Sequence, residues 1–196
     1  MKILAIADEE CRQIYEYYKP GMMKDNDLIL SAGDLHGEYL SFIVTMANRP
    51  LLYVPGNHDG RYATRPPEGC DNIDGKLVKI NGLRVLGLGG SYMYSGGPHQ
   101  YTERQMRARI RRLRFKLWRY RGVDVVLSHA PVYGYGDMPD LAHRGFECFR
   151  ELIDKYQPKL WIHGHVHQCY GTEFIRVRTR GSTRIVNACA KWEGEV

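Results

Sequence analysis

Acidic and histidine residues follow five apolar stretches of the sequence, at the point where each stretch ends. The five endings are Asp8, Gly33-Asp34, Gly56-Asn57-His58-Asp59, His129 and Gly164-His165-Val166-His167. In an open α/β fold, ligand sites form outside the carboxyl ends of the strands, so these five loops should converge. Imidazole and carboxylate groups together suit borderline divalent ions such as Zn, Mn and Fe. The spacing therefore predicts a metal centre.

Two divalent ions would give this centre a particular chemistry. Held about 3.5–4 Å apart, they can clamp both the attacking and the leaving oxygen of a phosphoryl group. The ligand that they share must be a carboxylate, because only that group offers two negatively charged oxygens. These residue types therefore suit a centre that activates water for attack on phosphorus.

The elements that must position these residues follow from the hydrophobic pattern, in which apolar runs alternate with amphipathic stretches. Strands are predicted at residues 2–7, 28–32, 51–55, 123–128 and 160–163, and helices at 9–18, 39–48 and 148–156. A hairpin is predicted at 76–80 and 84–87, with its turn at Asn81-Gly82. Residues 87–97 are expected to be a loop, and a strand at 172–177 is expected to pair antiparallel with one at 184–187. Thr102 should cap a helix that runs to about residue 121, and His163 is predicted to be a hydrogen-bonded core histidine.

Composition places the chain among globular proteins, and its 196 residues are expected to form one domain over 1–196. Hydrophobic residues make up 43% and charged residues 26% of the chain. No apolar run reaches the ~20 residues of a membrane helix, so no membrane partner is expected. The five cysteines show no C-x-x-C spacing, which disfavours disulfide frameworks and thiolate zinc sites and indicates a cytoplasmic protein.

Positive charge is concentrated in one segment. Between Arg104 and Arg121 the chain has nine Arg or Lys residues and no acid, against a net charge of +6 for the whole protein. This predicted helix could lie on nucleic acid, where each phosphate contact adds salt-sensitive affinity. It could instead be an amphipathic surface helix whose arginine stems cover Leu113 and Leu117. We favour the second interpretation, because base-stacking aromatic residues are not expected among these arginines.

The ordered motifs resemble those of one known family. Asp8-x-Glu10, Gly33-Asp34, Gly56-Asn57-His58-Asp59, Ser128-His129-Ala130-Pro131 and Gly164-His165-Val166-His167 are similar to the five motifs of calcineurin-like metallophosphoesterases. The resemblance covers nearly the whole chain and implies a four-layer αββα sandwich of two mixed β-sheets flanked by helices. It also implies roles for the residues. Asp8 and His167 would bind the first metal, Asp34 would bridge, and Asn57, His129 and His165 would bind the second.

The resemblance further implies a phosphoesterase mechanism. A hydroxide that bridges the two ions would attack phosphorus, and His58, its ring oriented by Asp59, would protonate the leaving alkoxide. Among phosphate-ester substrates we favour phosphodiesters, because the basic surface and small size suggest no monoester-specific cap. Two alternatives remain. One is a scaffold that has lost metal chemistry, as in the retromer complex, and the other is a nuclease that uses the arginine-rich helix.

Glu10 stands where the family pattern has histidine. If Glu10 binds the first metal with Asp8, Asp34 and His167, the shell has three carboxylates and should favour Mn or Mg over Zn or Fe. Alternatively, Glu10 turns away as a residue at a helix N-terminus, and His36 is its possible substitute. We favour ligation, because a position two residues after a strand-end aspartate already points at the site.

Overall fold

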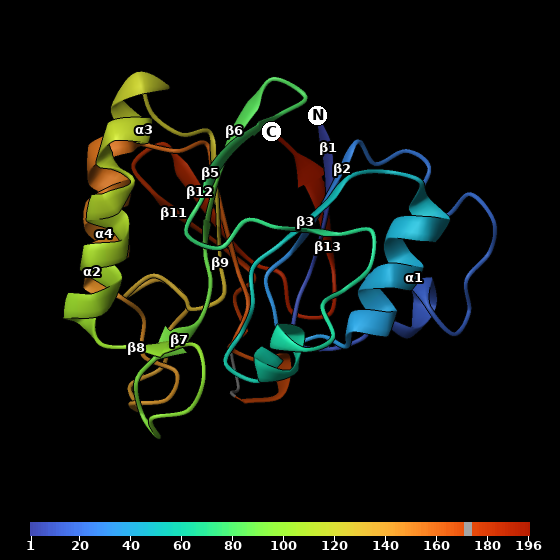
Figure 1. Ribbon diagram of the computed structural model, residues 1–196, viewed down its shortest axis with the longest axis horizontal. Helices are drawn as coiled ribbons and strands as arrows, with labels where there is room; N and C mark the ends of the chain where they lie inside the picture. Colours follow the sequence, from blue (N-terminus) through green and yellow to red (C-terminus); the bar gives the residue numbers. More distant parts are fainter. Residues whose placement is uncertain (171–173) are drawn as a thin grey trace.

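The structure is a computed structural model that describes residues 1–170 and 174–196. Two large mixed sheets pack face to face between two layers of helices (Figure 1). One sheet holds β1 (Lys2–Ile6), β2 (Leu28–Ser31), β3 (Leu51–Tyr53), β4 (Asp71–Asn72) and β13 (Trp192–Glu195). The other holds β5 (Leu77–Ile80), β6 (Leu83–Leu88), β9 (Val125–Ser128), β10 (Leu160–His163), β11 (Val177–Arg180) and β12 (Thr183–Asn187).

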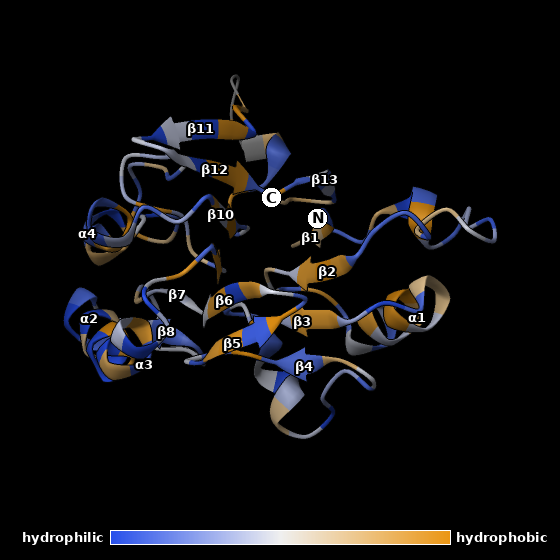
Figure 2. Ribbon diagram, turned by 90° about the horizontal axis from the view of Figure 1, so that it is seen from above, coloured by the Kyte–Doolittle hydropathy of each residue, from blue (hydrophilic) through white to orange (hydrophobic). Residues whose placement is uncertain are grey.

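The helices lie on the two outer faces of this pair of sheets. Helix α1 (Gly37–Ala47) covers the first sheet, and α2 (Glu103–Arg112), α3 (Arg114–Arg119) and α4 (Glu147–Tyr156) cover the second, as Figure 2 shows. Short 3₁₀ turns occur at Arg12–Ile14, Asp59–Ala63 and Gln168–Tyr170. The predicted four-layer αββα arrangement is therefore confirmed.

Alternation along the strands produces the layers. In β1 and the residue after it, Ile3, Ala5 and Ala7 face the second sheet, whereas Leu4 and Ile6 face α1. Strand β10 does the same with opposite partners, because Leu160 and Ile162 lie between the sheets and Trp161 packs under the other helices. Successive side chains of a strand point to opposite faces, so a continuous apolar run serves two cores at once.

Strand direction brings the polar loops together. Strands β1, β2, β3 and β4 are mutually parallel neighbours in the order β13-β1-β2-β3-β4. In the order β11-β12-β10-β9-β6-β5, strands β12, β10, β9 and β6 are also parallel. The antiparallel pairings lie at the edges, with β13 on β1, β11 on β12 and β5 on β6. The loops that carry the chemistry therefore leave each sheet at a common end.

The helix predicted at residues 9–18 is wrong. This segment contains only the 3₁₀ turn Arg12–Ile14, and Cys11 before it has extended backbone angles. Tertiary contacts decide its path, because the Cys11 N–H donates to the Tyr39 hydroxyl and Tyr15 packs edge-on against Phe42. Tyrosines have modest helix propensity, so packing on α1 prevails over the local preference.

The arginine-rich helix is divided. Thr102 caps α2 with its side chain and Gln105 completes a capping box, as predicted, but the helix changes to α3 at Leu113. The Leu113 N–H bonds the Ile110 carbonyl, a tighter turn than α-helical spacing. Leu113 and Leu117 both remain buried. The predicted apolar face is thus kept through the break.

The remaining differences concern short or polar strands. The predicted loop 87–97 contains β7 (Ser91–Tyr92), which pairs with β8 (Gln100–Tyr101), and β4 and β13 were not predicted. Strand β11 begins at Val177, so the strand predicted at 172–177 lies too early, and residues 172–173 are outside the described part of the chain. Strand β13 (WEGE) has no apolar run because it is an edge strand. Within the described residues, no helix combines the length and apolar character needed to cross a membrane.

Candidate metal centre

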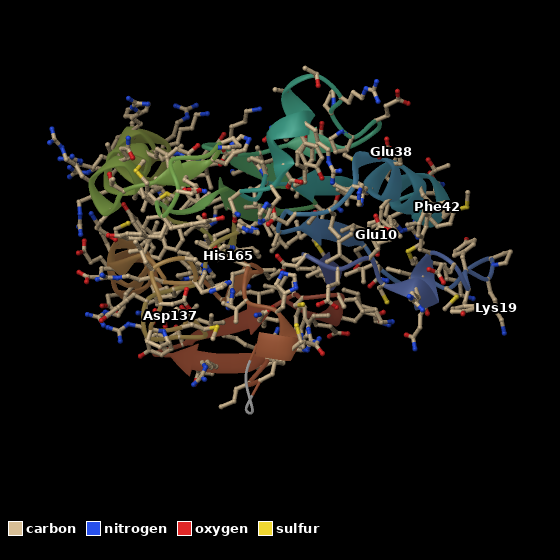
Figure 3. All side chains as sticks on the ribbon, turned by 90° about the horizontal axis from the view of Figure 1, so that it is seen from below. Glu10, Lys19, Glu38, Phe42, Asp137 and His165 are labelled. Carbon is tan, nitrogen blue, oxygen red and sulfur yellow. The ribbon has the colours of Figure 1, made fainter. Side chains whose placement is uncertain are left out.

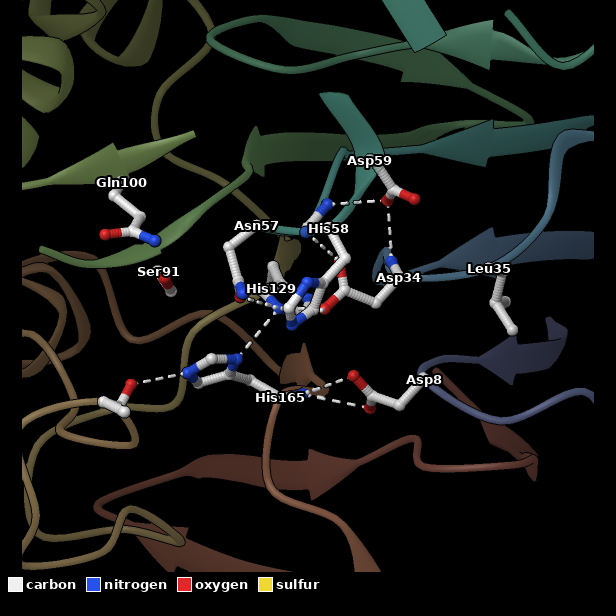
Figure 4. A network of polar contacts seen from close by, with 12 residues as sticks. Asp8, Asp34, Leu35, Asn57, His58, Asp59, Ser91, Gln100, His129 and His165 are labelled. Carbon is white, nitrogen blue, oxygen red and sulfur yellow. Dashed lines mark hydrogen bonds and ion pairs between the residues drawn. The ribbon is translucent and has the colours of Figure 1, made fainter. Parts of the chain in front are cut away.

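Four predicted ligands meet in one buried cluster (Figure 4). The His129 Nε2 atom lies 3.0 Å from Asn57 Oδ1, 3.0 Å from His165 Nδ1 and 3.4 Å from Asp34 Oδ2. The ligand atoms of Asp34, His129 and His165 all lie within 4.8 Å of one another. Ligands about 2.0–2.2 Å from one ion are up to about 4.4 Å apart, so these side chains could surround a single divalent cation.

The backbone fixes which nitrogen of each histidine faces the cluster. The other ring nitrogen of His129, Nδ1, lies 2.8 Å from the Ala32 carbonyl oxygen, and Nε2 of His165 lies 2.7 Å from that of Ala142. A carbonyl oxygen only accepts, so each of these nitrogens carries a proton. If both rings are neutral, their inward nitrogens bring lone pairs together at 3.0 Å. A cation between them removes this repulsion, so the residues fit a metal ion.

Burial and neighbouring charges shift the pKa values of the side chains in the cluster. Burial lowers the pKa of His165 to about 3. Burial would also lower the pKa of His129, but the charges of Asp34 and Asp8, with the hydrogen bonds to Asp34 and the Ala32 carbonyl, together raise it to about 9. Burial would raise the pKa of Asp34, but the charge and hydrogen bond of His129, with the His58 N–H, together lower it. A second proton on His129 and a bound cation are therefore alternative sources of positive charge for the cluster.

Asp59 holds two loops together. Its Oδ2 accepts the backbone N–H groups of Asp34, at 2.7 Å, and Gly56, at 2.8 Å, and the side chain is fully buried. We expected Asp59 to orient the His58 ring, but its carboxylate bonds to backbone amides instead. The two loops approach so closely that Asp59 is needed to satisfy their N–H groups. Burial raises the pKa of Asp59, and the two N–H donors oppose that rise.

His58 lies at the mouth of the cluster. Its backbone N–H donates to Asp34 Oδ1 at 2.8 Å, while its ring is 75% exposed with Nε2 4.0 Å from Asp34 Oδ2. The Asn57 Nδ2 atom donates to the Tyr94 hydroxyl at 3.2 Å, so Tyr94 also borders the site. A ring that is exposed yet close to the metal ligands can meet a bound substrate.

The predicted first-metal residues are arranged more loosely. The Asp8 carboxylate accepts the His165 backbone N–H at 2.9 and 3.0 Å, and burial raises the pKa of Asp8 to about 6. Glu10 contacts His36 instead, with Oε1 2.8 Å from Nδ1. Figure 3 labels Glu10 on the side of the site toward α1. His167 contacts Glu9, with Nδ1 3.1 Å from Oε1. Glu10 is at no helix N-terminus either, because the predicted helix is absent.

Backbone strain accompanies the ligands. Asp8, Asp34 and His165 have φ angles of 63°, 57° and 70°, in the left-handed region that residues other than glycine rarely adopt. Non-glycine residues in this region cost of order 1–3 kcal/mol each and concentrate at functional sites. His163, by contrast, is a core residue as predicted, with Nδ1 3.0 Å from the Gly164 carbonyl oxygen.

Two residues that border this site, Glu9 and Cys189, were not expected from the sequence. They carry no local signal, since their neighbours come from loops distant in sequence. Tyr94 also borders the site. Gly56, which belongs to the Gly56-Asn57-His58-Asp59 motif, allows Asp34 and His129 to approach each other.

Comparison with known proteins identifies the family. The sequence model of the calcineurin-like phosphoesterases matches residues 1–169, and the chain belongs to this family. The family and the cluster of candidate ligands support a metal-dependent phosphoesterase. The solved structure of TT1561 from Thermus thermophilus superposes with a TM-score of 0.67 at 20% identity, covering 96% of this chain and 88% of the other. That likeness supports the fold.

Individual relatives differ in how much they share. UPF0046 protein T07D4.2 of Caenorhabditis elegans is 36% identical over 70 residues, 35% of this chain and 16% of that protein. Uncharacterized protein MJ1162 of Methanocaldococcus jannaschii is 27% identical over 179 residues, 84% of this chain and 78% of the other. A lariat debranching enzyme of Drosophila pseudoobscura pseudoobscura is 28% identical over 150 residues, 59% of this chain and 28% of the enzyme. The chain thus spans less than a third of the first and third relatives.

Gly56→Ala should disrupt the centre without unfolding the protein. A Cβ at Gly56 would lie 2.0 Å from Asp34 Oδ1 and 2.7 Å from His129 Cε1, so both ligands must move. We expect metal affinity, measured by calorimetric titration of metal-free protein, to fall at least about tenfold. Gly37→Ala is the control, because its Cβ meets nothing closer than 3.6 Å. Equal affinity in both variants would contradict the geometry described for Asp34 and His129.

Proposed function

We propose that this protein hydrolyses phosphodiesters with two divalent metal ions, and that it does so in the cytoplasm. The observation that carries the proposal is the buried cluster of Asp34, Asn57, His129 and His165, whose two histidines each turn inward the nitrogen that a metal can bind. The cluster needs a positive charge, either a metal ion or a second proton on His129, because the inward lone pairs of the two rings are otherwise forced together. All five cysteines are free thiols, which supports a reducing compartment.

The bound ions would supply positive charge for the phosphoryl oxygens and lower the pKa of a water. The residues of the chain arrange the rest. Asp34 is fixed from both sides, since its N–H bonds to Asp59 and its Oδ1 accepts the His58 N–H. The amide of Asn57 can exchange Tyr94 for a phosphate oxygen. The exposed His58 ring can hold a proton beside the leaving oxygen.

The choice of phosphodiesters follows from what surrounds the site. The exposed His58 ring, the Tyr94 hydroxyl and His143, whose ring centroid lies 5.2 Å from that of His165, border the cluster, and the contacts of its described residues include no arginine that would hold a dianionic phosphate. A diester carries one negative charge and needs less cationic support. At the second ion, two imidazoles, a carboxylate and an amide suit Mn, Fe or Zn.

Metal dependence is the decisive test. Metal-free protein reconstituted separately with Mn, Fe, Zn and Mg should hydrolyse diesters, linear or cyclic, faster than monoesters. Asp34→Asn should lower kcat by at least about 10²–10³, because it removes a charged ligand from the centre. Full activity in protein shown by elemental analysis to be metal-free would overturn the proposal. Equal rates on all substrates would remove the diester preference alone.

His58→Ala should act selectively on leaving groups. Alkyl diesters need a proton at the departing oxygen, whereas nitrophenolate leaves without one, so loss of a general acid should cost about 10²–10⁴ on alkyl diesters and far less on nitrophenyl diesters. The measurement is kcat/KM for a matched series of diesters. Equal losses across the series would show that His58 acts on binding rather than on proton transfer.

A second candidate function, action on nucleic acid, rests on the surface of α3. Phe115 and Trp118 are 66% and 74% exposed, with ring centroids 5.8 Å apart, among the cations Arg114, Arg119 and Lys155. Aromatic rings among cations are a footprint of single-stranded nucleic acid binding, so the expectation that no base-stacking aromatic residues lie among these arginines is wrong. Arg107 and Arg109 are not available to it, because they pair with Glu151 and Asp74. One relative is a lariat debranching enzyme.

This surface can be tested separately from the centre. In Figure 1, α3 lies at the end where β1 begins, and β1 runs away from it toward Asp8. The combined variant Arg114→Gln, Trp118→Ala should therefore turn over small diesters at an unchanged rate. If polynucleotides are substrates, the variant should lose affinity for single-stranded RNA or DNA, with a shallower dependence on salt. Unchanged binding of both polymers would show that this surface does not bind nucleic acid and that α3 has only a structural role.

A further inference from the structure

A second group of potential metal ligands lies beside the first cluster. Donor atoms of Glu9, His167 and Cys189 are all within 4.8 Å of one another. The three residues come from the loops after β1, β10 and β12, and a bridge between Ala7 and Cys189 joins the first of these loops to the last. His167 was predicted to bind the first metal, but Glu9 and Cys189 have no role in that prediction. Cys189 is fully buried, so its thiol faces the protein interior.

The chain holds these loops in place through a network that is itself buried. The Asn187 side chain donates to the Val166 carbonyl at 2.8 Å and accepts the Cys189 N–H at 2.8 Å, so it joins the His167 loop to the Cys189 loop. The Ala190 N–H donates to the Ala7 carbonyl at 2.9 Å, which attaches the Cys189 loop to the end of β1.

Arg176 adds a second support to the Cys189 loop. Its Nη1 donates to the carbonyls of Asn187, Cys189 and Lys191 at 3.0, 3.1 and 3.1 Å. Three carbonyls around one guanidinium nitrogen hold the turn rigidly, and rigid support of this kind is what a preorganised ligand requires.

We propose that Cys189 and Glu9 are ligands of the first metal ion together with His167 and Asp8, and that Glu10 is not. The proposal rests on the dinuclear function proposed above and names the donor set of one of its two sites. On binding, the Sγ–H bond of Cys189 breaks, a Sγ–metal bond forms and the proton leaves to solvent. No oxidant or reductant is involved.

The distances suit a metal that accepts sulfur, nitrogen and oxygen together. With metal–sulfur bonds of about 2.3 Å and metal–nitrogen or metal–oxygen bonds of about 2.0–2.2 Å, two ligands of one ion are at most about 4.5 Å apart. The observed group needs only small side-chain movement to reach this range. Asp8 is close enough for its charge to act on both His167 and Cys189. A thiolate is a soft ligand, so this site should favour Zn, Fe or Co over Mn and Mg.

Glu10 is occupied elsewhere. It contacts His36 at 2.8 Å, on the side of the site toward α1 that Figure 3 shows. Glu9 and Glu10 are adjacent and carry the same charge, yet only Glu9 shares a ligand group with His167. The two glutamates therefore form a matched pair for an experiment.

Cobalt titration of metal-free protein tests the proposal without relying on activity. A cysteine thiolate bound to Co²⁺ gives a charge-transfer absorption in the near ultraviolet, which nitrogen and oxygen ligands do not produce. The wild-type protein should bind two Co²⁺ ions and show this band. Cys189→Ser should lose the band and bind one of the two ions at least about 100-fold more weakly, since even loss of outer-shell contacts costs 10–100-fold. Cys148→Ser is the control, a buried thiol on α4.

The glutamate pair provides the second arm. Glu9→Gln should lower the affinity for the same Co²⁺ ion at least about tenfold, whereas Glu10→Gln should change that affinity less than about threefold. Circular dichroism of each metal-free variant establishes that it is folded. If Cys189→Ser fails to fold, Cys189→Ala replaces it, because alanine places no unpaired hydroxyl in the interior.

The outcomes separate this proposal from the proposed function. Two bound Co²⁺ ions and metal-dependent hydrolysis without the thiolate band, or with a band that persists in Cys189→Ser, would overturn the ligand assignment and leave the function standing. A loss in Glu10→Gln that equals the loss in Glu9→Gln would likewise overturn it. Absence of Co²⁺ binding to wild-type protein would instead remove the dinuclear function itself.

Discussion

The carboxylate of Asp59 is the constraint on which the arrangement of the metal centre depends. One oxygen accepts the N–H groups of Asp34 and Gly56 and so holds the loops after β2 and β3 at a fixed separation. Asp34 can then accept the His58 N–H, and its other oxygen faces His129. The second oxygen of Asp59 has no hydrogen-bond partner among the described residues. A buried carboxylate with only one hydrogen-bonded oxygen lowers the stability of the fold. In this protein the same carboxylate positions the candidate ligands.

The two halves of the centre are organised by different means. Carbonyl groups of the backbone orient His129 and His165, so the ligand atoms of that half converge without an ion. In the other half, Asn187 and Arg176 position the loop rather than the ligand atoms, and His167, Glu9 and Cys189 contact one another. Backbone-oriented imidazoles form a rigid site, whereas side chains on a supported loop can adjust to the ion that binds. If both halves bind an ion, as proposed, unequal affinity for a given metal follows from this difference.

The departure from the family pattern at Glu10 has a structural counterpart. A histidine at that position would offer the first ion a nitrogen, and in this chain the position is used for a contact with His36. Cys189 offers a donor from the loop after β12 of the other sheet, and a bridge to Ala7 brings this loop beside the end of β1. The interpretation of this chain as a scaffold without metal chemistry rested on Glu10 alone. A complete alternative donor set weakens that interpretation.

Sequence by itself determined the layers and which side chains meet in the buried cluster. The continuous apolar runs of β1 and β10 require cores on both faces of each sheet, and the polar residues directly after parallel strands have to meet. These inferences depend on local periodicity, which can be read from one strand at a time. The failed helix at residues 9–18 and the break at Leu113 show where local preference yields to packing.

Only the tertiary structure decided the partners of side chains whose neighbours are distant in sequence. Asp59 was expected to orient the His58 ring, but its carboxylate accepts hydrogen bonds from two loop amides. Those amides lie beside Asp59 only when β2 and β3 are paired. Adjacent residues Glu9 and Glu10 point to different neighbours, a difference that no spacing rule distinguishes. Cys189 lies about 180 residues from Glu9 in sequence and meets it only because the two sheets close on each other beside β1. Contacts of this kind depend on the packing of complete sheets and carry no periodic signal.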